Sequence, residues 1–275
     1  TLVASVKDMR AARHARRPTI MMEHGAGQSY VGQRSQSYIG SPDRNGVIGV
    51  LVPNFDAAKR HQAAHPTIPV AVTGCPRLDV LRSAAAPTEN RIAISHHWEC
   101  TVVPETRSAF KHYKNAHKKL AQAFGGAIGH GHPRMWPYVK NHYAMAGLDP
   151  VQQFEDVVAQ AAVYITDNSS TLFEFAALDR PVVVMNAPWY RRDVNHGGRF
   201  WEWADVGPQV DKADDLIAAV EEALNDSDKQ AARRHEIIDK VYAHVGTATV
   251  RAVDAICDFV AATDTTHLTM PIPRV

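Results

Sequence analysis

One segment in the middle of the chain has the residue types of an anion-binding loop. Five polar residues follow the apolar run Val163–Thr166 and precede a helical pattern, namely Asp167, Asn168, Ser169, Ser170 and Thr171. The start of a helix offers unpaired backbone N–H groups and partial positive charge, which suit a phosphate. Ser and Asn are also preferred helix caps whether or not a ligand binds, but capping needs only one such residue. The pattern therefore favours phosphate binding.

A second segment combines a histidine with glycines at the end of a predicted strand. Glu23, His24 and Gly25 follow the apolar run Thr19–Met22, and Gly27 comes two residues later. Glycine lets a backbone bend sharply or approach a ligand closely. Histidine titrates near neutral pH and suits proton transfer. A structural turn also explains a lone histidine, so residue types alone leave both roles open for His24.

The segment Gly129–Arg134 places His130 and His132 at the end of another predicted strand. An H-x-H pair can ligate a metal, but neither a cysteine nor a carboxylate lies at ligand spacing nearby, so no metal site is predicted. His132 beside Arg134 suits an anion better. Among fifteen histidines, adjacent pairs such as His96-His97 are expected by chance.

Two further segments carry polar residues where connections are expected. Val72–Asp79 reads as a strand-to-helix turn with Arg77 and Asp79 at its edge, and a capped turn explains it as well as a binding role does. Cys75 has no histidine–carboxylate partnering near it, so a nucleophile is not predicted. Trp189–Trp203 is a long polar and aromatic segment, and long loops in compact domains are usually functional.

Short apolar runs rich in Val and Ile alternate with helical patterns along the chain, which is typical of an α/β fold with parallel sheets. The predicted strands lie at 2–5, 19–22, 47–52, 70–73, 92–95, 127–130, 163–166 and 181–185. The predicted helices lie at 8–16, 54–64, 105–124, 136–146, 151–160, 170–178, 212–224, 228–243 and 247–262. In such sheets ligands collect at the carboxyl ends of the strands, where the segments above lie.

The chain divides at Ser83–Asn90, which interrupts the alternation. We expect an N-terminal Rossmann-like domain over residues 1–84, a C-terminal one over residues 90–262 and a tail at 263–275. The first half is short for a complete nucleotide-binding domain. The chain opens at Thr1 with apolar residues, and the sequence leaves open whether residues before Thr1 complete this domain.

Composition excludes several classes of protein. The 275 residues carry a formal net charge of +1, which argues against a protein that coats nucleic acid. The basic run from Arg10 to Arg17 fits a solvated helix face. No apolar run approaches the roughly 20 residues that cross a bilayer, and no signal-peptide pattern is present. Three widely spaced cysteines indicate a reducing compartment, so a cytoplasmic location is predicted.

Taken in order, these segments resemble a known family. The pattern HG, G-x-PR-x-D, HP, ITD-x-SS-x-x-F-E and L-x-x-P-V is similar to that of the CDP-glycerol glycerophosphotransferases of teichoic-acid synthesis. The resemblance runs from Glu23 to Leu224 and is most specific at Ile165–Glu174 and Gly74–Asp79. It implies a GT-B fold, with two Rossmann-like domains that face a cleft and a nucleotide-activated donor held mainly by the C-terminal one.

The resemblance also implies roles for individual residues. His24 matches a proposed general base on the acceptor hydroxyl, and His132 matches a histidine near the donor phosphates. Ser169 and Ser170 match phosphate-binding serines, and Glu174 matches a carboxylate suited to the ribose. The predicted site consists of His24 and His132 as catalytic residues, with a substrate-binding set of Gly25, Arg77, Asp167, Asn168, Ser169, Ser170, Thr171 and Glu174.

The family pattern does not extend to every position. The segment after His24 has no lysine, and Asn168 stands where the family often has an aromatic residue. We therefore predict a transferase that moves either a sugar or glycerol phosphate from a UDP- or CDP-linked donor to an acceptor hydroxyl, without a cofactor. The alternatives are an isomerase like UDP-N-acetylglucosamine 2-epimerase and a non-catalytic nucleotide-sugar-binding protein.

Overall fold

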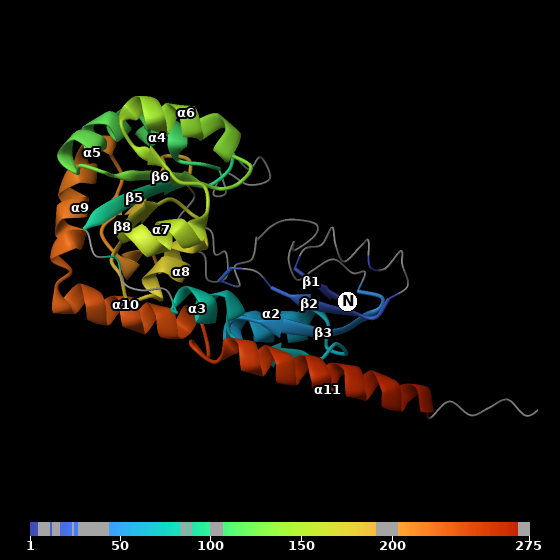
Figure 1. Ribbon diagram of the computed structural model, residues 1–275. Coiled ribbons are helices and arrows are strands. Elements are labelled where there is room, and N and C mark those ends of the chain that lie inside the picture. The colour runs from blue at the N-terminus through green and yellow to red at the C-terminus, as the bar shows by residue number, and fades with distance from the viewer. Residues whose placement is uncertain are drawn as a thin grey trace, which may run out of the picture. The chain divides into compact units, whose positions relative to one another are not determined.

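The computed structural model describes residues 1–4, 12, 17–23, 25–26, 44–83, 87, 90–99, 107–190 and 203–268 (Figure 1). These residues form two compact units, each built on a parallel sheet. Unit 1 comprises the described residues within Thr1–Asp79 and Lys240–Val275, and unit 2 comprises those between Val80 and Asp239. The alternation of strand and helix read from the sequence is thus present in both halves of the chain.

Unit 1 has a four-stranded sheet in the order β1-β2-β3-β4. Its strands are β1 (Leu2–Val3), β2 (Thr19–Met22), β3 (Val47–Val52) and β4 (Val70–Val72), and all pairs are parallel. Its helices are α2 (Phe55–Ala64) and α11 (Ala248–Leu268), and α3 (Pro76–Leu81) begins in it. The predicted helix at 8–16 falls almost wholly outside the described residues.

The C-terminal helix α11 completes the core of unit 1. It packs along β3 (Figure 1), where Ala252 and Phe259 join Ile20 and Leu51 in one buried cluster. Gly49 allows this approach, because a Cβ atom there would overlap the ring of Phe259. Residues 240–262, which the sequence analysis assigned to the C-terminal domain, therefore pack with the N-terminal sheet. The helix also continues to Leu268, into the predicted tail at 263–275.

Unit 2 has a six-stranded parallel sheet in the order β10-β9-β8-β5-β6-β7. Its strands are β5 (Arg91–His96), β6 (Ile128–Gly131), β7 (Asp149–Pro150), β8 (Ala161–Thr166), β9 (Val182–Met185) and β10 (Gln209–Val210). The sequence predicted the four longer ones. The two-residue strands β7 and β10 lie at the edges, where too few residues pair to give an apolar pattern.

Helices cover both faces of this sheet. They are α4 (Phe110–Tyr113), α5 (His117–Ala123), α6 (Trp136–Ala146), α7 (Phe154–Gln160), α8 (Thr171–Ala176), α9 (Leu216–Asn225) and most of α10 (Asp228–Val241), with 3-10 turns η2 (Lys114–Ala116), η3 (Ala204–Val206) and η4 (Ala213–Asp215). Because α5 contacts both α6 and α9, these three share one face, and α7 and α8 lie on the opposite side (Figure 1). The 3-10 turn η2 divides the described part of the helix predicted at 105–124 into α4 and α5.

Candidate functional site

The carboxyl ends of three adjacent strands in unit 2 bring the sequence-predicted segments together. In the sheet register Ser95 of β5 pairs with both His130 of β6 and Thr166 of β8. The residues that follow these strands therefore emerge side by side at one sheet edge. They are the segments that begin at His97, His132 and Asp167.

Asp167 holds this edge together. It is fully buried, its Oδ1 accepts a hydrogen bond from the backbone N–H of His97 (2.8 Å), and its Oδ2 accepts one from that of Ala109 (2.9 Å). The Nδ1 atom of His96 lies 3.8 Å from Oδ2. Two backbone donors to one carboxylate fix the segments after β5 and before α4. In this structure Asp167 binds the backbone of the protein.

His132 is held as a neutral imidazole. Its backbone N–H donates to the carbonyl of His96 (3.0 Å), and its Nδ1 accepts from the backbone N–H of Arg134 (3.1 Å). Partial burial, with the nearby His97 and Arg134, lowers the pKa of His132 to about 4, and Asp167 opposes this shift only in part. Since Nδ1 is an acceptor in the neutral ring, the proton sits on Nε2, which is a hydrogen-bond donor.

The hydroxyl groups after β8 form a short chain. Tyr164 and Thr171 share a hydrogen bond between their hydroxyl groups (3.0 Å), and the Thr171 hydroxyl donates to Oγ of Ser169 (2.8 Å). Ser170 is the N-cap of α8, but its side chain makes no capping hydrogen bond. Both serines are half-buried. The capping explanation therefore does not account for the Ser170 hydroxyl.

Asn168 and Glu174 are buried beside these serines in the chain. Asn168 is 2% exposed, and neither atom of its side-chain amide makes a hydrogen bond with the residues that the structure describes. A buried amide without partners is costly, so such a group points to a missing partner. Glu174 lies in the first turn of α8 and is 5% exposed.

The remaining predicted residues belong to unit 1. His24 lies outside the described residues. Gly25 has a φ of +79°, a left-handed conformation that favours glycine, in agreement with the bend predicted for it. Arg77 is exposed on α3. The structure thus gathers His132 and the 167–171 segment in unit 2, and places Gly25 and Arg77 in the other unit.

Unit 1 buries a polar pair that includes Glu23, the residue that precedes His24 in the sequence. The side chains of Glu23 and His61 are each 1% exposed, and Oε1 of Glu23 lies 3.3 Å from Nε2 of His61. Asn54 ties the same region together, because its side-chain amide donates to the carbonyl of Ala26 (3.1 Å) and to that of Val241 (2.9 Å).

Sequence reasoning missed a row of three histidines behind the site, of which His96 and His117 are fully buried and His142 is half-buried. Nε2 of His96 lies 3.0 Å from Nε2 of His117, whose Nδ1 lies 3.0 Å from Nε2 of His142. Burial, with the neighbouring His96 and His142, lowers the pKa of His117 to about 2. The adjacent pair His96-His97 at a strand end was the available signal. His96 belongs to this row, whereas the ring of His97 lies 5.3 Å from that of His132.

Neither a metal site nor a membrane-spanning helix is found among the residues that the structure describes. Within them, no group of three or more His, Cys, Asp or Glu side chains is placed to hold a metal ion. No helix in the same part of the chain has both the length and the apolar character to cross a bilayer.

Comparison with known proteins identifies a family resemblance in the C-terminal half. Residues 130–258 match the model of the family described as CDP-Glycerol:Poly(glycerophosphate) glycerophosphotransferase. This range contains His132, the 167–171 segment and Glu174, so the resemblance predicted from the sequence is confirmed for this part of the chain. No curated protein is significantly similar in sequence.

Solved structures share the fold. The wall teichoic acid polymerase TagF superposes with a TM-score of 0.60 at 15% identity, covering 92% of this chain and 69% of that one. The UDP-GlcNAc 2-epimerase from Neisseria meningitidis, solved with UDP-GlcNAc, gives 0.57 at 14%, covering 94% and 75%. The S. aureus MnaA structure with UDP gives 0.58 at 13%, covering 95% and 74%. At such identities the likeness shows the fold alone, and the predicted GT-B class is confirmed.

Proposed function

From its resemblance to the glycerophosphotransferase family over residues 130–258, we propose that this chain is a transferase. It moves a sugar or glycerol-phosphate group from a nucleotide-diphosphate-activated donor to an acceptor hydroxyl. The donor is UDP- or CDP-linked, and its diphosphate binds at the carboxyl ends of β5, β6 and β8. The family match supports the transferase class, and the donor group and acceptor are part of the proposal.

One observation carries this proposal. His132 presents an Nε2–H donor at the same sheet edge as two half-buried serines, and the Ser170 hydroxyl is not used to cap α8. Hydrogen-bond donors fixed before a ligand arrives stabilise developing negative charge without reorganisation. A nucleotide phosphate that leaves with the bonding electron pair needs such donors.

The proposed reaction uses these groups in one displacement. The acceptor oxygen forms a bond to the transferred group while the bond from that group to the nucleotide breaks. For a sugar this is the bond from the sugar carbon to the diphosphate, and a nucleoside diphosphate leaves; for glycerol phosphate it is the P–O bond within the diphosphate, and a nucleoside monophosphate leaves. The electron pair leaves with the phosphate oxygen of the departing nucleotide, where His132 and the serine hydroxyls donate hydrogen bonds. The acceptor proton passes to a base, a role that we propose for His24.

The neutral state of His132 defines its contribution. With a pKa of about 4, the free enzyme at pH 7 holds an uncharged imidazole, so His132 acts as a hydrogen-bond donor and not as a cation. The same proton on Nε2 is required for that role. We therefore assign His132 to stabilisation of the phosphate of the leaving nucleotide.

A thermal-shift panel tests the donor class. CDP, UDP, GDP and ADP conjugates are added to the chain, and the conjugate that binds raises the melting temperature by mass action. With that donor, His132→Ala is expected to reduce turnover roughly 100-fold, the scale found when one such donor is removed. His112→Ala is the matched control, because His112 lies in unit 2 with its Nε2 on the carbonyl of Asp211. Equal turnover in both variants would exclude the role of His132.

The epimerase structures favour one second candidate, an isomerase of nucleotide sugars. Incubation of the chain with the stabilising donor in the absence of acceptor separates the two. An epimerase converts the donor to a new nucleotide sugar, whereas a transferase gives only slow hydrolysis of the donor, with release of its nucleotide.

A cytoplasmic location is also part of the proposal. Cys257 is a free thiol and is exposed. Exposed free thiols are typical of proteins in a reducing compartment.

A further inference from the structure

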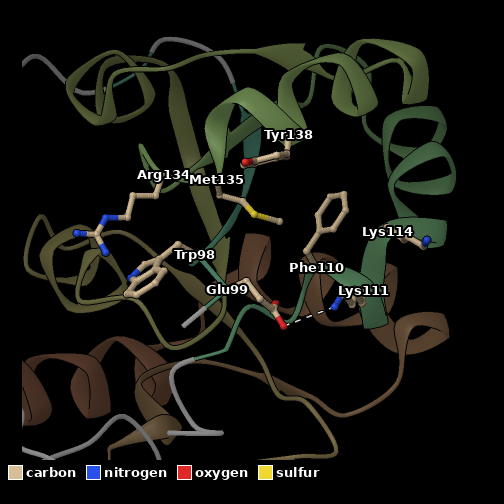
Figure 2. A pocket seen from close by; sticks show the side chains of 8 residues that line it. All are labelled: Trp98, Glu99, Phe110, Lys111, Lys114, Arg134, Met135 and Tyr138. Atoms are coloured by element: carbon tan, nitrogen blue, oxygen red, sulfur yellow. Dashed lines mark ion pairs between the residues drawn. The ribbon is translucent and has the colours of Figure 1, made fainter. Parts of the chain in front are cut away.

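Unit 2 contains a cavity whose lining residues are not part of the proposed donor site. It has a volume of about 530 Å³, within the range of small-molecule sites. Trp98, Phe110, Met135 and Tyr138 form its apolar lining, and four charged residues border it (Figure 2). None of its lining residues comes from β8 or α8. The cavity lies over the segments that follow β5 and β6.

We propose that this cavity binds a phosphorylated sugar. The inference concerns a site separate from the donor diphosphate site, and it stands whether or not the transferase proposal holds. Two features of the lining identify the ligand class, one for the phosphate and one for the sugar ring.

The phosphate is selected by charge. Lys111, Lys114 and Arg134 border the cavity against one carboxylate, that of Glu99. Glu99 pairs with Lys111 at 3.5 Å, whereas Lys114 and Arg134 have no carboxylate partner among the residues that the structure describes. Two such cations at one cavity make its potential positive, which favours an anionic ligand, and Arg134 offers several donors to the oxygens of a phosphate.

The guanidinium of Arg134 is already oriented. It lies over the ring of Trp98, 4.6 Å from the ring centroid. Trp98 follows His97, whose backbone N–H is bound by the buried Asp167 (2.8 Å). Stacking on a ring leaves the edge of a guanidinium available to a phosphate and reduces the entropy lost on binding.

The sugar ring is selected by the apolar wall between these cations. In Figure 2 Arg134 lies to one side and Lys111 and Lys114 to the other, with Phe110, Met135 and Tyr138 between them. An apolar surface between charges fits a ligand with a flat body. The Glu99 carboxylate, which is 40% exposed, accepts hydrogen bonds from hydroxyl groups and disfavours a body without them.

Rigid packing behind the cavity keeps this wall in place. The ring of Phe110 packs edge-on against His96 (5.3 Å) and His142 (5.1 Å). Tyr138 is 76% exposed, so it can be changed without disturbing the core. The Trp98 ring, which lines the cavity, lies 6.1 Å from the ring of His132 in the proposed donor site. A ligand in the cavity would therefore be close to that site.

Calorimetric titration of the whole chain with glucose 6-phosphate, glucose, inorganic phosphate and UMP tests the inference. Glucose 6-phosphate is expected to bind at least about tenfold more tightly than glucose or phosphate, since both features contribute. Arg134→Gln, which removes the oriented guanidinium, should weaken it about tenfold, and Lys114→Gln, which removes a cation from the other side of the cavity, about threefold. Tyr138→Ala should weaken glucose 6-phosphate about threefold and leave phosphate unchanged.

Lys140→Gln is the control for charge, because Lys140 is exposed on α6 and does not line the cavity. It should leave the affinity unchanged. The inference is overturned if Lys140→Gln weakens binding as much as Lys114→Gln, or if glucose 6-phosphate binds no better than phosphate. It is also overturned if UMP binds more tightly and loses its affinity in Arg134→Gln, because the cavity would then belong to the nucleotide. Nucleotide-donor binding in Tyr138→Ala is measured separately, so that failure of the transferase proposal remains distinguishable.

Discussion

Two helices that begin just after a parallel strand, one in each unit, use their first residues differently. In unit 1 Asn54 caps α2, accepts from the backbone N–H of Ala57 (2.8 Å) and donates to the carbonyls of Ala26 and Val241. In unit 2 Ser170 occupies the N-cap of α8 and makes no capping hydrogen bond.

Asn54 both caps its helix and holds neighbouring segments in place, whereas in unit 2 a residue other than the helix cap holds the neighbouring segments. Asp167 carries the connections there, through the backbone N–H groups of His97 and Ala109. The hydroxyl of Ser170 makes no capping hydrogen bond, and we propose that it binds a ligand. Buried polar residues with a full set of protein partners build the fold, and those without them are the candidates for binding.

Asp167→Ala should have the largest effect on stability. It removes two hydrogen bonds to a carboxylate and leaves two buried N–H groups unpaired, which costs about 3–5 kcal/mol in the free energy of unfolding of unit 2. Hydrogen exchange of peptides from β5 and β8 measures this unit separately from unit 1. Asp167→Asn, which keeps one acceptor, should fall between the variant and the wild type. A loss below about 1 kcal/mol in the alanine variant would contradict the assignment.

Asn54→Ala should be the next largest change, in unit 1. It removes a cap and leaves the carbonyls of Ala26 and Val241 without this donor, a loss of about 2–3 kcal/mol. Urea unfolding followed by hydrogen exchange in β3 measures it. If Asn54→Ala proves as mild as a surface substitution, the contrast between the two helix starts fails.

Acid should weaken unit 2 through its buried histidine row. The folded-state pKa of His117 is about 2, below the ordinary 6.5, so the folded state binds fewer protons than the unfolded state between these values. Stability therefore rises with pH in this window, and lowering the pH from 7.5 to 5 should cost about 2 kcal/mol. His132, with its pKa of about 4, acts in the same direction.

His117→Gln is the matched variant, since it keeps a polar side chain that does not titrate. Its free energy of unfolding should depend less on pH over the same range, whatever its absolute stability. An unchanged pH dependence would show that His117 titrates normally in the folded protein.

Ser170→Ala should have the smallest effect on stability. Loss of a working serine cap costs about 1 kcal/mol, but this side chain makes no capping hydrogen bond, so the expected loss is about 0.5 kcal/mol or less. Thermal unfolding without ligand measures it. A loss near that of Asn54→Ala would mean that the hydroxyl is structural.

The local part of this description could be read from the sequence. The apolar run of β8 and the polar segment after it are adjacent in the chain, and a glycine at position 25 predicts a bend by residue type alone. The role of Asp167 could not be read, because a carboxylate suits a ligand or two backbone N–H groups equally well.

Contacts between residues far apart in the chain were also beyond the sequence. The apolar pattern of α11 predicts a buried face, but it does not say which sheet buries it. The fit of Phe259 over Gly49 decides that in favour of unit 1. The row from His96 to His142 likewise draws on three separate elements, so no local pattern reveals it.

The central claim is that the hydroxyls after β8 bind the diphosphate of a nucleotide donor. Calorimetry of CDP and UDP with the wild type and with a Ser169→Ala/Ser170→Ala double variant tests it most directly, with Ser83→Ala as the control. We predict that one nucleotide binds the wild type and Ser83→Ala equally, and binds the double variant at least about tenfold more weakly while its melting temperature stays close to that of the wild type. Equal affinity for the wild type and the double variant would contradict the claim.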